Sequence, residues 1–144
     1  MRGFRIGVLL GVLALIAGGV GAIKARGSDT RASAATVKVA ESEMKVVSSA
    51  KQVPAGKVTF IVRNTGSVVH ELVILRADVS LKGVPVVGFK AQEDEVGEVI
   101  DEAEDLEPGT STRLTVNLKP GKYILLCNIV GHYQLGMRTS LRVT

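Results

Sequence analysis

Hydrophobic and polar residues alternate along six stretches between residue 36 and the end of the chain. In the stretch KVTFIVRNT, for example, Val58, Phe60 and Val62 fall on one side of an extended backbone. A repeat of two residues is typical of a β-strand with one buried face. We therefore expect strands at residues 36–40, 57–65, 70–76, 112–118, 123–127 and 138–144.

Turn-forming combinations of proline, asparagine and glycine separate these stretches. They occur at residues 54–56, 64–66, 108–109 and 120–121. The pattern predicts an all-β domain, an antiparallel Greek-key β-sandwich. Residues 78–107 are the least regular part of the chain, and we expect a long connection there, with room for a short helix or strand.

The first residues follow a different pattern. Two arginines precede an apolar run of 18 residues, 6–23, and basic residues also follow it. This arrangement predicts a signal peptide or a membrane-anchor helix in residues 1–25, a linker in 26–35 and the folded domain in 36–144. Both a signal peptide and a membrane anchor would place the domain outside the cytoplasm. We expect a periplasmic or extracytoplasmic protein, soluble after signal cleavage or tethered to the membrane through residues 6–23.

The formal net charge of +4 comes from the first 35 residues, because residues 36–144 contain 13 basic and 13 acidic residues. Only 3% of the residues are aromatic and there is no basic stripe, so we expect no nucleic-acid partner. Between Lys90 and Arg113 all charged residues are acidic: Glu93, Asp94, Glu95, Glu98, Asp101, Glu102, Glu104, Asp105 and Glu107. Such a run is either a solvated connection or a surface that steers a basic partner.

The chemically distinctive residues are concentrated in the sequence CNIVGHYQLGM. It contains the only cysteine, Cys127, together with His132 and Met137. In an exported domain a single cysteine cannot form an internal disulfide, so it is free, paired with another chain or a metal ligand. Strand parity places Cys127 on the inward face with Tyr123 and Leu125, and it places Met137 on the inward face of the last strand.

The only other histidine, His70, begins a predicted strand and has the parity of Leu72 and Ile74, so it can also point between the sheets. A thiolate, two imidazoles and a thioether are the donors of a mononuclear copper site for electron transfer. Zinc normally takes four strong ligands, and this set has three. The residues therefore favour copper.

This arrangement resembles the cupredoxins, the plastocyanin and azurin family of small blue copper proteins, from about Thr36 to Thr144. The resemblance is carried by the Cys-x4-His-x4-Met loop, by a tyrosine four residues before the cysteine and by an upstream histidine that follows an Asn-x-Gly turn. It implies that His70, Cys127 and His132 are the equatorial ligands, and Met137 the weak axial ligand, of one type 1 copper ion. One position departs from the family pattern. Many members have an asparagine after the upstream histidine, which ties the two ligand loops together, whereas this chain has Glu71.

The resemblance implies a monomeric one-electron transfer protein that is not an enzyme. Its copper ion would alternate between Cu(I) and Cu(II), and its partners would be redox proteins such as a c-type cytochrome or a membrane oxidase. Electrons would leave through His132, surrounded by an apolar docking patch made of Ile129, Val130, Tyr133 and Leu135. Of the remaining residues, Tyr123 is expected to have a structural role and Met44 to belong to the core.

The alternative function is a copper carrier or storage protein without a redox-shuttle role. The sequence favours this less, because no cluster of methionine and histidine is present. A cysteine hydrolase would need an orienting group and an oxyanion hole, and no motif supplies either. Binuclear copper sites of the oxidase type need two cysteines, and multicopper oxidases need many histidines, so composition excludes both.

Overall fold

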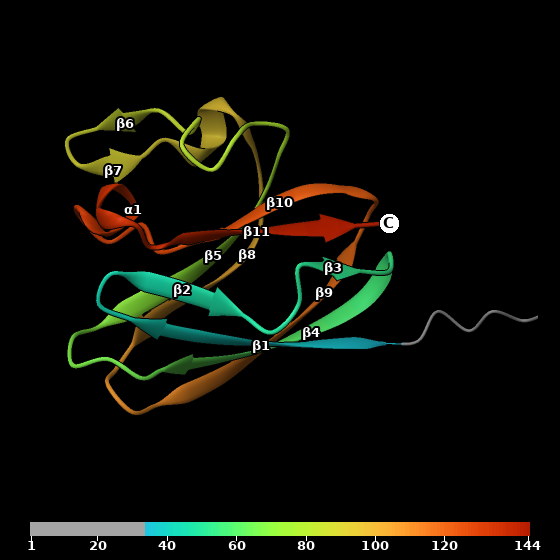
Figure 1. The fold of residues 1–144 in the computed structure, drawn as a ribbon, viewed down its shortest axis with the longest axis horizontal. Helices are drawn as coiled ribbons and strands as arrows, with labels where there is room; N and C mark the ends of the chain where they lie inside the picture. Colours follow the sequence, from blue (N-terminus) through green and yellow to red (C-terminus); the bar gives the residue numbers. More distant parts are fainter. Residues whose placement is uncertain (1–33) are drawn as a thin grey trace, which may run out of the picture.

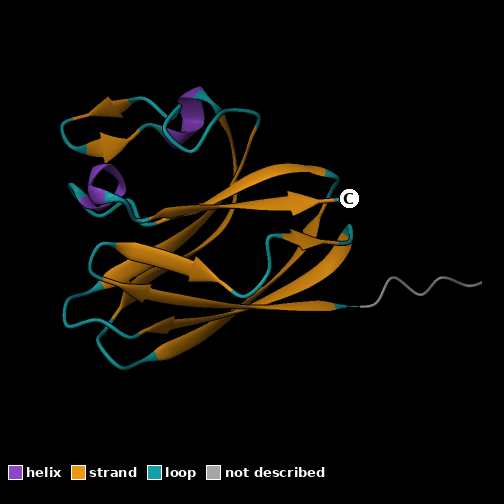
Figure 2. Cartoon of the chain, in the orientation of Figure 1, coloured by secondary structure: helices purple, strands orange, loops and turns teal. Residues whose placement is uncertain are grey.

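The computed structural model describes residues 34–144. The predicted signal peptide or anchor, and most of the predicted linker, lie outside the described residues. Two sheets pack face to face as a β-sandwich (Figure 1, Figure 2). The first sheet contains, in spatial order, β2 (Lys45–Ser48), β1 (Ala35–Ser42), β4 (Gly56–Asn64) and β9 (Ser111–Leu118). The second contains β3 (Gln52–Val53), β11 (Arg138–Val143), β10 (Gly121–Leu126), β5 (His70–Ala77) and β8 (Gly97–Leu106).

The remaining elements are short. They are β6 (Val86–Val87), β7 (Lys90–Ala91), the 3-10 helix η1 (Glu93–Glu95) and the single helical turn α1 (His132–Leu135). The β6–β7 hairpin and α1 lie at one end of the sandwich, at the left of Figure 1, whereas β1 begins at the opposite end. Within residues 34–144, no helix has the length and the apolar character needed to cross a membrane.

All six predicted strands are present, and the prediction of an all-β sandwich is confirmed. The prediction that the sheets are purely antiparallel is wrong, because β1 runs parallel to β4 and β3 runs parallel to β11. Two neighbouring strands that are joined by a hairpin are antiparallel, whereas a crossover connection allows them to be parallel. Between β1 and β4 the chain crosses to the second sheet and back through β3, so no hairpin joins them.

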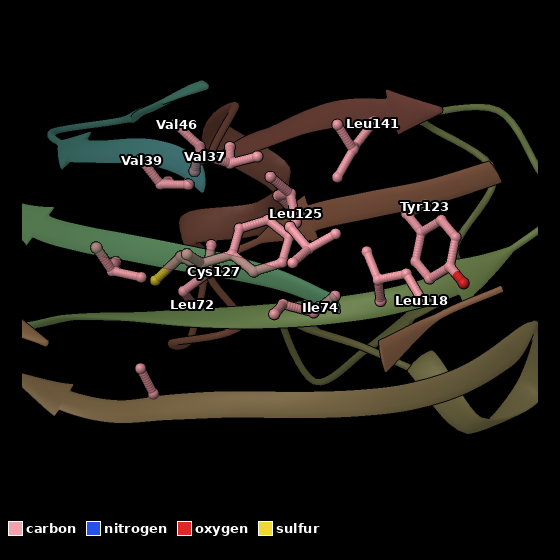
Figure 3. Packing of buried hydrophobic residues seen from close by; sticks show 14 of the residues in the cluster. Val37, Val39, Val46, Leu72, Ile74, Leu118, Tyr123, Leu125, Cys127 and Leu141 are labelled. Carbon is pink, nitrogen blue, oxygen red and sulfur yellow. The ribbon is translucent and has the colours of Figure 1, made fainter. Parts of the chain in front are cut away.

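The core lies between the sheets and is formed by the inward positions of their strands. Figure 3 shows Leu72 and Cys127 at one end of this core, and Leu118 and Tyr123 at the other. A second cluster covers the outer face of β5 and β10, under the segment that carries β6 and β7. Because both faces of these two strands are buried, their sequences contain the uninterrupted apolar runs LVIL and ILL.

The predicted connection at residues 78–107 does contain short strands and a short helix, β6, β7 and η1. The prediction is wrong in the second half of this segment, where the ten-residue strand β8 pairs with β5. The strand is hard to recognise for two reasons. It lies at the edge of its sheet, so only Ala103 and Leu106 are buried. In addition, the register with β5 shifts twice, which breaks the alternation of apolar and polar positions. The acidic side chains that remain exposed protect this edge from pairing with another chain.

Two minor predictions concern single side chains. Tyr123 is buried, and its hydroxyl group donates a 2.8 Å hydrogen bond to the carbonyl oxygen of Lys119, which supports a structural role. Met44 lies in the turn between β1 and β2 and not on a strand, and it packs against the core while remaining partly exposed.

Candidate metal centre

The four predicted ligands lie at the end of the sandwich that carries α1. His70 is the first residue of β5, Cys127 directly follows β10, His132 begins α1, and Met137 directly precedes β11. The backbone closes the loop between them. The N–H of Cys127 donates to the carbonyl oxygen of Met137 at 3.1 Å, and the N–H of Met137 donates to that of His132 at 3.0 Å.

Two glycines allow the loop to reverse direction within so few residues. Gly131, directly before α1, has φ 84°, and Gly136, directly after it, has φ 126°. Residues with a β-carbon rarely adopt these values. A β-carbon at position 136 would also lie 3.1 Å from the carbonyl oxygen of Met44. The spacing of the motif therefore depends on glycine at both ends of the helical turn.

Three of the predicted ligands converge on one point. One potential ligand atom from each of His70, Cys127 and His132 lies within 4.8 Å of the other two. The sulfur of Cys127 is 3.4 Å from Nδ1 of His132, and the two imidazole rings meet edge to face with centroids 5.2 Å apart. His70, Cys127 and Met137 are completely buried, whereas His132 is half-buried. His132 is thus the member of the set that reaches the surface.

The nitrogens of His70 fit a metal-binding role. Both ring nitrogens are buried, and neither has a hydrogen-bond partner among the residues that the structure describes. Buried polar atoms without partners are uncommon, because they lose their hydrogen bonds to water without replacement. A metal ion bound by one nitrogen would remove this cost for that nitrogen. The soft sulfur and the two imidazoles are also the donors that copper prefers.

The protonation states of the centre follow from burial. Burial raises the pKa of the Cys127 thiol to about 11, so the thiol is protonated at neutral pH in the absence of metal. Burial also lowers the pKa values of His70 and His132, although the carboxylate of Glu43 opposes this in both. Both imidazoles are therefore neutral and able to bind a metal ion. Metal binding at this centre must displace the thiol proton, so affinity should increase with pH.

Comparison with known proteins settles the family. A family model described as the cupredoxin-like domain matches residues 9–137. The chain belongs to this family. The prediction of a cupredoxin is therefore confirmed, and the three converging side chains with Met137 are consistent with a type 1 copper site.

Individual relatives of this cupredoxin fall into two groups. The iron uptake system component EfeO of Yersinia pestis is 32% identical over 119 residues, which is 83% of this chain but 26% of that protein. The chain thus spans about a quarter of the length of the curated relatives it matches. Among solved structures, the reduced auracyanin of Roseiflexus castenholzii has 24% identity and a TM-score of 0.58, covering 77% of this chain and 98% of auracyanin. Rusticyanin of Thiobacillus ferrooxidans has 20% identity and a TM-score of 0.59, covering 78% and 79%. These two likenesses show the fold.

Glu71 occupies the position at which this cupredoxin departs from the family pattern, and it does connect the ligand segments. Its N–H donates to the sulfur of Cys127 at 3.4 Å, and its carboxylate accepts the N–H of Asn128 at 2.9 Å. The glutamate therefore ties the start of β5 to the start of the ligand loop. Burial raises the pKa of this carboxyl, while the hydrogen bond from Asn128 lowers it.

Asn128 is a residue that the sequence analysis missed. Its side chain accepts the N–H of Ala91 at 2.6 Å and donates to the Ala91 carbonyl oxygen at 2.9 Å and to the carboxylate of Glu93 at 2.7 Å. It thereby fixes β7 and η1 against the ligand loop. The only sequence signal is an asparagine directly after the cysteine, and that signal does not identify its distant partners.

Two acidic residues near the centre were also missed. Glu43 is partly exposed and lies 3.6 Å from Nε2 of His70. Backbone hydrogen bonds to its carboxylate lower its pKa to about 2. Glu41 is completely buried, and neither carboxylate oxygen has a partner in the described chain. Burial raises its pKa to about 8, with a further contribution from Glu71. A charged residue at the inward parity of Val37 and Val39 was the available signal for Glu41.

Proposed function

We propose that this cupredoxin transfers single electrons between redox proteins outside the cytoplasm. One type 1 copper ion would be held by His70, Cys127, His132 and Met137 and would supply the Cu(I)/Cu(II) couple. The observation that carries the proposal is the convergence of the first three side chains within 4.8 Å, with both His70 nitrogens buried and unpartnered. The location and the possible tether through residues 6–23 rest on the sequence alone.

The surroundings of the ligands suit electron transfer. Electron transfer is fast when the ligand geometry changes little between the two oxidation states. Here His70, Cys127 and Met137 are part of a strand or adjoin one, and backbone hydrogen bonds join Cys127 to Met137 and Met137 to His132. Asn128 and Glu71 attach the loop to neighbouring segments. These contacts hold the donors in place without the metal.

An enzymatic role has less support. A nucleophilic cysteine needs an accessible sulfur and a depressed pKa, whereas Cys127 is completely buried and burial raises its pKa. Three cavities on the surface of the described residues are lined by parts of β1, β2, β4, β5, β8, β9, β10 and β11 and of the connections between them, and none of the three includes a predicted ligand. Similar solved structures include auracyanin A, a blue copper protein, and rusticyanin, a copper protein. We therefore propose that the protein acts as a monomeric carrier of electrons without substrate chemistry.

The second candidate is a metal carrier, and the likeness to iron uptake components favours it. The two candidates differ in what leaves the protein, an electron or the metal. Copper-loaded full-length protein is expected to give one reversible one-electron wave in voltammetry. It should also exchange electrons with a small redox reagent faster than a Cu(I) chelator removes the metal. If the chelator removes the metal faster than the redox reagent exchanges electrons at every chelator concentration, the result would support a metal carrier.

A surface for the redox partner lies around His132. The exposed apolar side chains there are Val130 and Leu135 of the ligand loop, which are 60% and 65% exposed. Phe89, at the tip of the β6–β7 hairpin, is 65% exposed, and its carbonyl oxygen accepts the N–H of Gly131 at 2.8 Å. Tyr133 is buried, with its hydroxyl group bonded to the carbonyl of Leu81, so its predicted place in the patch is wrong. We propose that Phe89 takes that place.

Charge on the two sheets could orient the partner. The acidic residues of the 93–107 segment lie on η1, on the edge strand β8 and in the connections beside them. The outer face of the first sheet is basic instead. It carries Lys38, Lys45, Lys57, Arg63 and Arg113, all exposed. We propose that the acidic edge steers a basic protein, such as a c-type cytochrome or the exposed domain of a membrane oxidase, toward the apolar patch.

Association with a basic cytochrome should therefore slow as salt is added, because exposed charges are screened over about 8 Å at physiological ionic strength. The measurement is the bimolecular electron-transfer rate across a salt series. A variant with Glu102, Glu104 and Asp105 changed to amides should show a smaller salt slope than the wild type. The control is Lys38→Gln with Lys57→Gln and Arg113→Gln, which should not reduce the rate. If the rate depends on salt equally in the wild type and in the acidic-edge variant, β8 does not steer the partner and its acidic residues are only solvated.

A further inference from the structure

Glu43 lies in the turn between β1 and β2, and the loop that precedes His70 is folded around its carboxylate. One oxygen, Oε1, accepts the N–H of Ser67 at 2.6 Å and that of Val68 at 2.9 Å, and the Ser67 hydroxyl group is 3.3 Å away. The same oxygen is 3.6 Å from Nε2 of His70. A single carboxylate therefore contacts both the loop and the ring of the predicted ligand.

Gly66 packs directly against this carboxylate. A β-carbon at position 66 would lie 2.5 Å from Oε1 of Glu43, closer than nonbonded atoms approach. The backbone at Gly66 does not have the left-handed conformation that favours glycine, in contrast to Gly131 and Gly136. The glycine therefore leaves space for the carboxylate where the structure places it. The Asn-x-Gly turn that marks the upstream histidine is closed locally, since the N–H of Gly66 donates to Oδ1 of Asn64 at 2.8 Å, and Glu43 packs against it from more than 20 positions earlier in the chain.

We propose that Glu43 is a positioning residue of the metal centre, whose carboxylate keeps the proton of His70 on Nε2 and leaves Nδ1 free to bind the metal. The proposal rests on the proposed metal-binding role of His70. Neutral imidazole carries one N–H, and a negative charge beside one nitrogen favours the proton there. The 3.6 Å separation is longer than a hydrogen bond, so the effect is electrostatic.

The other groups around the His70 ring do not compete for this role. His132 meets it edge to face and is neutral at neutral pH, because burial lowers its pKa. Glu71, the next residue, uses its carboxylate for the N–H of Asn128. Glu43 is thus the charged side chain that faces Nε2. A carboxylate behind a ligating imidazole also makes the imidazole a stronger donor and favours the more highly charged metal state.

The test is Glu43→Gln in the full chain. Glutamine keeps an oxygen for Ser67 and Val68 but removes the charge, so the loop can stay folded. Nitrogen-15 NMR of the metal-free protein should place the His70 proton on Nε2 in the wild type, and should show a mixture of both tautomers in the variant. In the copper-loaded protein, the ratio of Cu(II) to Cu(I) affinities should fall about tenfold. This change equals a rise of about 59 mV in reduction potential.

The matched control is Asp78→Asn, which makes the same chemical change past the opposite end of β5, where the aspartate forms only an exposed pair with Lys122. It should alter neither the tautomer nor the potential. A wild-type proton on Nδ1, or a variant indistinguishable from Asp78→Asn in both measurements, would overturn the proposal. If the wild-type tautomer is Nε2–H and responds to Glu43→Gln but copper does not bind, the positioning role stands and the proposed function fails.

Discussion

Changing Cys127 to serine should abolish the intense visible absorption of the copper-loaded protein. The band of a type 1 centre arises from charge transfer between a cysteine thiolate and Cu(II), and a serine oxygen lacks the soft donor orbital. Serine fits the site, since its hydroxyl oxygen can accept the Glu71 N–H that the Cys127 sulfur accepts at 3.4 Å. The fold should therefore survive, so a loss of colour would result from the missing thiolate ligand and not from unfolding. The measurement is a visible spectrum during titration with Cu(II).

Met137→Leu provides the control for this experiment. Methionine is expected to be the weak axial ligand, so its loss should preserve the colour and raise the reduction potential. Leucine has nearly the volume of methionine and suits a completely buried position. A colourless wild type that is saturated with copper would contradict the electron-transfer proposal. If Cys127→Ser retains the full absorption band, Cys127 is not a copper ligand.

Much of the fold and the convergence of the centre could be predicted from the sequence, because both depend on strand parity. Cys127 follows the inward positions Tyr123 and Leu125, and His70 shares the inward face of Leu72 and Ile74. Two inward residues at the same end of adjacent strands must lie close together, and β5 and β10 are adjacent. The spacing to His132 is short enough for one loop to complete the set.

The rest could not be predicted because it depends on which distant segments meet. The ladder of β8 is interrupted by two register shifts, so its local pattern is not that of a strand. Glu43 and His70 are separated by β2, β3 and β4 and meet only because β1 pairs with β4, which leads into the His70 loop. The local sequence also does not indicate that β1 and β4 pair in parallel. Long-range contacts of this kind have no periodic signature.

Glu41 is a completely buried carboxyl with no partner for either oxygen in the described structure. Such a group remains protonated, because the charged form would lose its hydration. Burial raises its pKa in the folded protein from 4.5 to about 8. The unfolded chain releases this proton near pH 4.5, whereas the folded chain keeps it until about pH 8. Stability from this group therefore falls as pH rises through that window.

Glu41→Gln should remove this pH dependence from the metal-free protein. Glutamine resembles the protonated carboxyl in size and stays neutral, so the variant and the wild type should have similar free energies of unfolding near pH 4.5. By pH 8 the variant should be more stable, by up to about 4 kcal/mol at 1.36 kcal/mol per pKa unit. The two histidines have lowered pKa values, so their contribution to stability rises with pH below pH 6.5, opposite to that of Glu41. The quantity to measure is therefore the difference between the two proteins by chemical denaturation from pH 4.5 to 8. A difference that stays constant over this range would mean that the Glu41 carboxyl ionises in the folded state as it does in the unfolded one.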